Sequence, residues 1–177
     1  MKPMTEHDFR ALFAQHKNTV YQFAWRMTNC PATAEDIVQE VFLTLWRGEA
    51  EVDPARGSSR ALLLGMARHF AWRHCRQDRR WTVFEDDTAI TEPLALDSLD
   101  LQAAVSHAVA QLPALQREAL ILATYSELSL QEIAEASHAE LGTIKARLHR
   151  ARENLKRLLA NYKPIRELTR RDYGTSE

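Results

Sequence analysis

The stretch LSLQEIAEASHAELGTIKARLHRARENLKRLL, residues 128–159, decides the fold of the second half of this chain. Ser129 and Glu132 match the capping-box pattern, in which a serine and a glutamate three positions later cap the start of a helix reciprocally. They predict a short helix that ends near Ala136, and Ser137 to Ala139 then predict a turn. A long helix follows. The stretch therefore predicts two helices joined by a tight turn.

The longer helix has an apolar side and a basic side. The apolar residues recur every three or four positions, as on a buried helix face: Leu141, Ile144, Leu148, Ala151, Leu155 and Leu158. The opposite side carries mostly basic residues: Thr143, Lys145, Arg147, Arg150, Arg152, Lys156 and Arg157. A short helix, a tight turn and a long helix with basic first turns describe a DNA-reading helix-turn-helix. The alternative is a helical hairpin with a solvated basic face.

Position along this helix predicts which of its basic residues contact bases and which contact phosphates. Side chains near the start of a recognition helix reach base edges, and arginine can hold guanine through two hydrogen bonds. We therefore expect Lys145 and Arg147 to read bases. Residues further along such a helix reach phosphates; here they are Arg150, Arg152 and Lys156.

Composition limits the class of protein. The chain has 177 residues, of which 45% are hydrophobic and 27% charged, and its net charge is −1; these values are typical of a chain that buries a core. No run is long and apolar enough to span a membrane, and the N-terminal MKPMTEHDFR lacks the apolar centre of a secretory signal. Two cysteines cannot build a disulfide framework. We expect a cytoplasmic protein.

The charges are strongly segregated along the chain. Residues 60–80 carry six arginines and one aspartate, and residues 141–163 carry seven basic residues and one glutamate. Between them, residues 81–101 hold six acids and neither lysine nor arginine. Two basic segments separated by an acidic one favour two contact surfaces for an anionic partner. Two solvated helix faces are the alternative.

The first half also has helical periodicity. Apolar residues recur from Phe9 to Met27, and Asn29-Cys30-Pro31 interrupts the pattern. We expect Thr33 to cap a second helix that ends near Trp46, and a third helix from Arg60 to about Asp78. The residues expected to face inward on the third helix are Leu62, Leu63, Met66, Phe70 and Trp72.

The whole chain therefore predicts an all-α protein of two small helical domains joined by a flexible acidic linker. The second domain begins with a helix over Leu101–Gln111, and Pro113 is expected as the first residue of the next helix. The expected boundaries are residues 1–80 for the first domain, 81–100 for the linker, 101–163 for the helix-turn-helix domain and 164–177 for a tail.

Over about residues 8–163, the chain resembles the extracytoplasmic-function (ECF) sigma factors of bacterial RNA polymerase. AEDIVQEVFLTLWR (Ala34–Arg47) is similar to the family's polymerase-binding helix, and Asp53–Arg80 is similar to its promoter-melting segment. Leu112–Leu122 and Gly142–Leu159 resemble its promoter-upstream domain. Two sets of motifs in the right order are far more specific than either set alone. The family has these two helical domains and a flexible linker.

The resemblance implies three binding surfaces. Polymerase, through a coiled coil of its largest subunit, is expected to contact Glu35, Asp36, Gln39 and Glu40. The −10 element is expected to contact His69, Trp72, Arg73, Arg76, Arg79 and Arg80, because melted DNA needs cations for phosphates and aromatic surfaces for bases. The −35 element is expected to contact Thr143, Lys145, Arg147, Arg150, Arg152 and Lys156.

Each surface has an alternative interpretation. Acids near a helix start are favoured by the helix dipole alone, although we expect Asp36 and Glu40 to be exposed. Phe70 and Trp72 can instead belong to the core. The family most often has asparagine where His69 stands, so no base-specific role is assigned to His69.

The implied function is that of an alternative sigma factor without catalytic activity. Its expected partners are core RNA polymerase, promoter DNA and an anti-sigma factor, often a membrane protein; no cofactor, metal or small-molecule substrate is expected. A conventional helix-turn-helix regulator, with a sensor or dimerisation domain in the first half, is the main alternative. An enzyme is a weaker one, because the spacing of His69, His74 and Cys75 does not suit metal ligands on a helix, Cys30 lies at a helix break, and CxxC and HExxH motifs are absent.

Overall fold

The computed structural model describes residues 4–50, 52, 58–77, 100–160 and 162. In this part of the chain all regular structure is helical, which confirms the all-α prediction. The helices are α1 (Glu6–Thr28), α2 (Pro31–Trp46), α3 (Ser59–Gln77), α4 (Leu101–Gln111), α5 (Ala114–Tyr125), α6 (Leu130–Ala136) and α7 (Leu141–Leu158). The predicted linker lies outside the described residues apart from Asp100, and so does the predicted tail.

The break after α1 lies where the sequence places it, but α2 begins earlier than expected. Asn29 ends α1 in the left-handed conformation, with φ 53°. Cys30 is the N-cap of α2 and Pro31 is its first residue, so the prediction that Thr33 caps this helix is wrong. Proline suits the first helical position because its φ is already helical and its missing N–H needs no partner there.

The second half follows the predicted helices closely. Asp100 caps α4 by accepting a hydrogen bond from the Ala103 N–H at 2.7 Å. The capping box between Ser129 and Glu132 is present at the start of α6. Pro113 is the N-cap of α5 rather than its first residue, one position away from the prediction.

The predicted apolar face of α7 is confirmed. Ile144, Leu148, Ala151 and Leu158 are buried, and Leu141 and Leu155 are half-buried. Asn154 is also buried on this side, where its amide donates to Gln116 Oε1 on α5 at 2.8 Å. This bond supplies a polar contact inside an otherwise apolar face and fixes α7 against α5.

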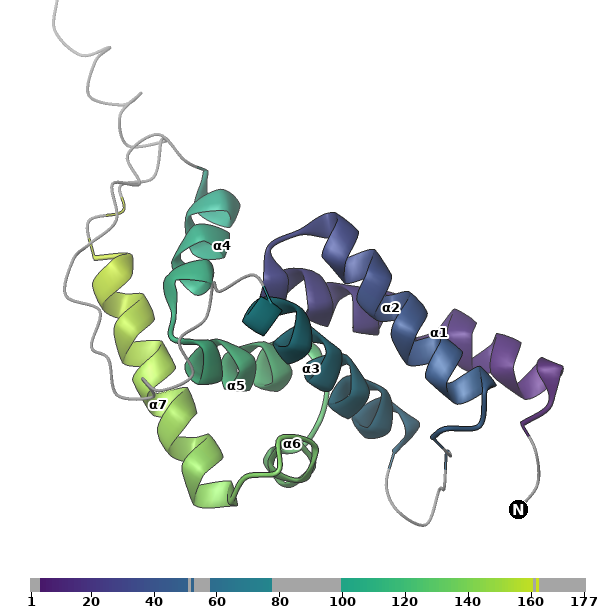
Figure 1. Ribbon diagram of the computed structural model, residues 1–177. Helices are drawn as coiled ribbons and strands as arrows, with labels where there is room; N and C mark the ends of the chain where they lie inside the picture. The colour runs from purple at the N-terminus through teal and green to yellow at the C-terminus, as the bar shows by residue number, and fades with distance from the viewer. Residues whose placement is uncertain (1–3, 51, 53–57, 78–99, 161, 163–177) are drawn as a thin grey trace, which may run out of the picture.

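Helix α3 buries a wider face than predicted. Leu63 is buried as expected, whereas Leu62, Met66 and Phe70 are only half-buried. The buried residues of α3 are Leu63, Leu64, Ala67, Ala71, Trp72 and Cys75. The reason is visible in Figure 1: α3 lies between α1 and α2 on one side and the helices of the second half on the other.

The two halves share one core. A single apolar cluster includes Phe23 and Ile37 from the first half and Leu122, Ile133 and Ile144 from the second. Helix α1 packs against α4 and α5, and α3 packs against α6. A smaller cluster around Leu112 and Leu158 joins α4 to α7. The sequence predicts two helical domains, but it does not predict that they pack together.

His16 is buried in α1 where the helix meets the start of α3. Its Nε2 lies 3.3 Å from Ser59 Oγ, and the positively charged Arg60 is nearby. Burial, and to a lesser extent the charge of Arg60, lower the pKa of His16 below its usual 6.5. The folded protein therefore favours the neutral imidazole.

This predicts an acid-sensitive stability. Above pH 6.5 both folded and unfolded chains hold His16 neutral, so its contribution is complete; as pH falls below 6.5, the unfolded chain takes up a proton that the folded chain does not, and the free energy of unfolding falls. His16→Gln should reduce this loss between pH 7.5 and 5.5 in urea denaturation. His107→Gln, at an exposed position of α4, is the control. Equal pH dependence in wild type and His16→Gln would contradict the assignment.

Candidate polymerase and DNA interfaces

The first candidate interface is the exposed face of α2. Glu35, Asp36 and Gln39 are exposed, whereas the opposite side of the helix buries Ala34, Ile37, Val41 and Leu45 in the core. These three polar residues are free to meet a partner without disturbing the packing of the helix. The exposure expected for Asp36 is confirmed, and the polymerase-docking role of this edge stays a prediction.

Glu40 differs from the rest of that edge. Its carboxylate forms an ion pair with Arg73, and the other oxygen lies 3.2 Å from His74 Nε2; both partners belong to α3. Glu40 is therefore half-buried, and the expectation that it is fully exposed is wrong. The spacing along α2 could not show this, because the two partners come from another helix.

An apolar groove continues the α2 face, and the sequence analysis did not identify it. Leu43 and Trp46 follow Gln39 on the same side of the helix and remain 46% and 52% exposed. With Phe9 and Phe42 they line a groove of about 510 Å³, whose rim includes Gln39, Glu6 and Arg10. The Phe9 and Trp46 rings meet edge-on, with centroids 5.0 Å apart. Leu43 and Trp46 lie four and seven positions after Gln39, and this helical spacing is the feature of the sequence that could have predicted their place on the same face.

The second candidate interface is on α3. His69, Arg73 and Arg76 are exposed. Phe70 lies between two of them, because the His69 ring contacts it edge-on at 5.6 Å and the Arg73 guanidinium lies 4.9 Å from its centroid. His69, Phe70 and Arg73, with Met66 and residues of α2 and of the turn after it, line a hollow of about 450 Å³. A cation beside an aromatic ring is the combination that binds phosphates and unstacked bases.

Trp72, which is also predicted for the −10 surface, is arranged differently from these exposed residues. Trp72 is buried, and its indole N–H donates to the carboxylate of Glu118 on α5. The same carboxylate receives a hydrogen bond from Arg68 Nε at 2.7 Å. In this structure the second half of the chain thus covers Trp72. Arg79 and Arg80 lie outside the described residues, as do positions 53–57 of the predicted promoter-melting segment.

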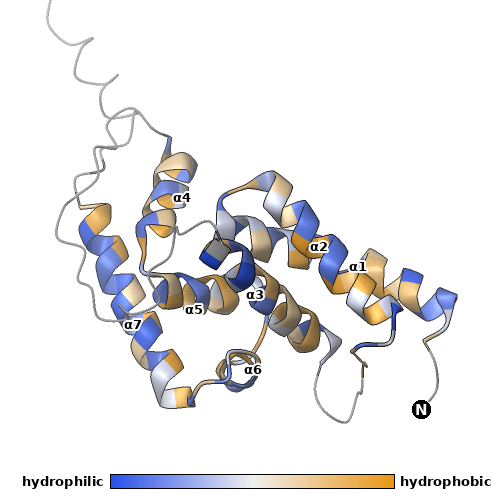
Figure 2. Ribbon diagram, viewed as in Figure 1, coloured by the Kyte–Doolittle hydropathy of each residue, from blue (hydrophilic) through white to orange (hydrophobic). Residues whose placement is uncertain are grey.

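The third candidate interface is the basic side of α7. Lys145, Arg150, Arg152 and Lys156 are exposed, and Thr143 and Arg147 are half-buried. Figure 2 shows the ribbon of this helix as mostly hydrophilic with apolar residues at intervals, and the buried apolar residues belong to the side that packs on α4, α5 and α6. The capped α6 and a short turn lead directly into the start of α7 (Figure 1). This is the arrangement of a helix-turn-helix that presents its second helix to a DNA groove.

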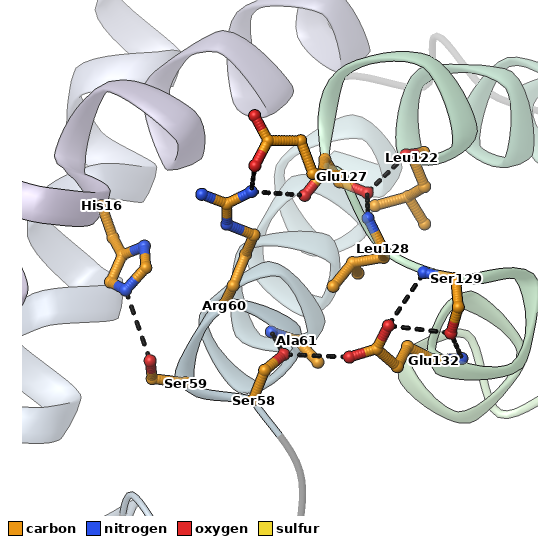
Figure 3. Close-up of polar contacts among 11 residues, drawn as sticks. His16, Ser58, Ser59, Arg60, Ala61, Leu122, Glu127, Leu128, Ser129 and Glu132 are labelled. Atoms are coloured by element: carbon orange, nitrogen blue, oxygen red, sulfur yellow. Dashed lines mark hydrogen bonds and ion pairs between the residues drawn. The ribbon is translucent and has the colours of Figure 1, made fainter.

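Polar contacts tie the first half to the second where α3 begins (Figure 3). Arg60 forms an ion pair with Glu127 and donates to the Ser126 carbonyl at 3.2 Å. Ser58 Oγ donates to Glu132 Oε1 at 3.2 Å, so the glutamate of the α6 capping box also contacts the start of α3. These contacts join sequence segments about seventy positions apart.

Further contacts join α1 to the second half. Arg117 of α5 donates to the Met27 carbonyl at 3.0 Å, and its other nitrogen bonds the carbonyls of Ala110 and Leu112. Burial lowers the pKa of Arg117 to about 10, so it remains charged at neutral pH. The Arg26 guanidinium lies 3.9 Å from the centroid of the Tyr125 ring.

The residues weighed for a metal site have other surroundings. His74 contacts Glu40, Cys75 is buried and Cys30 is half-buried. No group of three or more histidine, cysteine or acidic residues suited to a metal ion occurs among the described residues. Within the same residues, no helix is long and apolar enough to cross a membrane.

Comparison with known families identifies the class of both halves. Residues 12–82 match Sigma-70 region 2, and residues 102–155 match Sigma-70 region 4. Regions 2 and 4 define a sigma factor, a transcription initiation factor of bacterial RNA polymerase. We use these region names below for the two halves of the chain.

Proteins of similar sequence identify the family of sigma factors to which the chain belongs. The ECF RNA polymerase sigma factor SigK of Mycobacterium sp. (strain KMS) is 30% identical over 170 residues, which cover 90% of this chain and 88% of that protein. SigK of Mycobacterium tuberculosis (strain ATCC 25618 / H37Rv) is 29% identical over the same length, with 91% of that protein covered. The chain belongs to the ECF family of sigma factors.

Solved structures agree with this assignment. The sigma factor RpoE from Bartonella quintana, in complex with the anti-sigma factor NepR, is 28% identical and matches with a TM-score of 0.67, covering 88% of this chain and 99% of that one. CnrH, in complex with the cytosolic domain of CnrY, has the same TM-score over 90% of this chain and 92% of its own, at 21% identity. The latter shows a shared fold.

The α7 geometry predicts two distinct mutational phenotypes. Arg147→Ala should cost about 1–3 kcal/mol on the best −35 duplex and relax the preference at one base pair, because a base contact is lost. Lys156→Ala, two to three turns later, should weaken all duplexes alike and reduce the slope of log affinity against log salt by about one. Binding of the full chain to a panel of −35 duplex variants measures both. A uniform loss for Arg147→Ala across the panel would make Arg147 a phosphate contact.

Proposed function

We propose that this sigma factor binds core RNA polymerase through α2 and directs initiation at promoters that α3 and α7 recognise at the −10 and −35 elements. The observation that carries the proposal is that each family region presents an exposed polar face opposite its buried one. In region 2 these faces are on α2 and α3, and in region 4 on α7. We propose no catalytic activity and no cofactor for the chain itself.

Polymerase docking is assigned to Glu35, Asp36 and Gln39 together with the apolar groove beside them. Acids and an amide can pair with basic and polar side chains of the polymerase, and Leu43 and Trp46 add apolar area at the same face. A centre of exposed aromatic and aliphatic side chains with a polar rim is the usual composition of a protein interface. Glu40 is half-buried beside this surface and connects it to α3 through its contacts with Arg73 and His74.

DNA contact is assigned to two separate faces. Arg73 and Arg76 on α3 supply cations, Arg73 and His69 contact the Phe70 ring, and we propose that these residues hold the melted −10 strand. Arg79 and Arg80 remain predicted contacts. On α7, Lys145 and Arg147 are proposed to read bases of the −35 element, and the basic residues after them to hold its phosphates.

We further propose that an anti-sigma factor controls the protein. The support is that RpoE, the structural relative of 28% identity, was solved in complex with the anti-sigma factor NepR. Transcription takes place in the cytoplasm, which is where we propose this chain acts.

In vitro transcription with purified core polymerase on a library of random promoters tests the proposal. Initiation that depends on this chain and selects paired −35 and −10 sequences is expected. Binding to a duplex without any promoter-dependent initiation would instead identify a conventional helix-turn-helix regulator, since such a protein does not replace the sigma subunit. Polymerase pull-down provides the parallel measurement.

The docking surface makes a specific prediction. Asp36→Lys with Gln39→Lys should weaken binding to core polymerase about tenfold or more, because two contacts become repulsive at the interface. Both positions are exposed, so circular dichroism and the unfolding midpoint should not change. The affinity is measured by fluorescence anisotropy with purified core.

The control carries the same change in charge elsewhere. Glu135→Lys with Gln102→Lys alters exposed positions on α6 and α4 by the same total charge. It should leave core affinity within about twofold of wild type. Equal losses in the two double variants would show that the effect is one of net charge and that the α2 surface is misassigned.

A further inference from the structure

The outward side of α7 has an order that its basic composition alone does not show. Gly142, Ala146 and His149 are exposed, and each is followed two positions later by a buried residue. Two positions correspond to about 200° around an α-helix, so the three exposed residues form a line directly opposite the core. Glu153 continues this line four positions after His149. We call these four residues the centre line of α7.

Cations lie on both sides of the centre line. Placed around the helix axis by their spacing, the exposed basic residues form two rows. The first row contains Lys145, Arg152 and Lys156, and the second contains Arg150 and Arg157. A DNA major groove admits one helix, and its base edges lie between two phosphate backbones. The two rows therefore match the backbones, and the centre line matches the base edges.

The position of Glu153 agrees with this orientation. It is the one acid in the sequence of α7, and it accepts a hydrogen bond from Lys156 at 2.8 Å. The hydrogen bond and charge of Lys156, and to a lesser extent the charges of His149 and Arg157, lower the pKa of Glu153 below its usual 4.5. Because an ionised carboxylate is repelled by phosphates, the line that carries it fits the middle of the groove better than either backbone.

The start of the centre line has room for a close partner. A Cβ added at Gly142 would have no described atom within 4 Å apart from its chain neighbours and the backbone of its own helix, so packing inside the protein does not require glycine there. Ala146 adds only a methyl group. The first long side chain on the centre line is therefore that of His149, about two turns after the helix begins.

The imidazole of His149 can distinguish classes of base. It carries an N–H donor in either neutral tautomer. In the major groove both purines present N7 as a hydrogen-bond acceptor, whereas a pyrimidine has no such atom. Arg147, by contrast, lies three positions after buried Ile144 and is half-buried, so it approaches DNA from the edge of the face rather than from its centre.

We infer that His149 is a specificity-determining residue for the −35 element, and that its imidazole donates a hydrogen bond to N7 of one purine in the middle of the major groove. The inference rests on the proposed function, because it concerns the DNA-reading role of α7. It adds a base contact to those proposed for Lys145 and Arg147, and it names the chemical class of base that His149 selects.

Promoter selection from a random library tests the base preference. Core polymerase with the wild-type full chain should prefer a purine about fivefold or more at one −35 position, because a pyrimidine there loses one hydrogen bond. His149→Ala should reduce this preference to about twofold or less and leave the other −35 positions unchanged. His107→Ala, at an exposed position of α4, is the matched control and should select the same promoters as the wild type.

Replacement of one DNA atom tests the contact itself. A promoter with 7-deazaguanine or 7-deazaadenine at the selected position lacks the N7 acceptor but keeps Watson–Crick pairing. Initiation with the wild-type chain should fall about fivefold on this promoter, and initiation with His149→Ala should not change, since that hydrogen bond is already absent. The same replacement at a purine upstream of the −35 element is the control and should affect neither chain.

The outcomes distinguish this inference from the proposed function. Absence of any −35 preference with the wild-type chain would overturn the proposed reading of the −35 element by α7. Equal preferences for wild type and His149→Ala, or wild-type initiation that tolerates 7-deazapurines at every −35 purine, would overturn the role of His149 alone. The atom replacement needs only the wild-type chain, so it remains decisive if His149→Ala impairs initiation at all promoters.

Discussion

The carboxylate of Glu118 is the interaction on which the arrangement of the two regions depends. It lies almost fully out of water between an arginine and an indole of region 2, and a buried charge is tolerated only while its partners remain in place. Region 4 therefore cannot shift on α3 by a small amount without breaking this pairing. The shared core around Ile133 and Phe23 buries apolar surface of both regions, and the charged contacts fix the orientation of one region relative to the other.

Because of this packing, the three proposed binding faces differ in their exposure to solvent in the free protein. The polar edge and groove of α2 and the basic side of α7 are exposed, whereas part of the α3 face is covered. Glu40 adds a link between two of them, because it holds Arg73 and His74 beneath the edge that is proposed to meet polymerase. Contact with polymerase on α2 is therefore physically adjacent to the residues proposed to receive DNA.

The sequence predicts correctly those features of the fold that depend on residues close together along the chain. The capping box at Ser129, the break at Asn29 and the apolar stripe of α7 depend on neighbours within a few positions, and the structure confirms them. Thr33 was misassigned because Pro31 already starts α2. The pairing of Glu118 with Arg68 joins positions fifty residues apart on different helices, and helical periodicity carries no information about such a contact. The unusual burial of Gln116, Arg117 and Glu118 in one turn of α5 marks that interface only once the structure is known.

Exchange of the Trp72 indole proton with solvent, followed by NMR in the free full-length chain, tests the packing of region 4 on region 2 most directly. Trp46 serves as a reference in the same spectrum because it is 52% exposed, and Trp72→Phe assigns the signal. The account predicts that the Trp72 proton exchanges far more slowly than that of Trp46, since it is buried and bonded to Glu118. Exchange of Trp72 as fast as that of Trp46 would contradict the claim that region 4 closes on region 2 in the free protein.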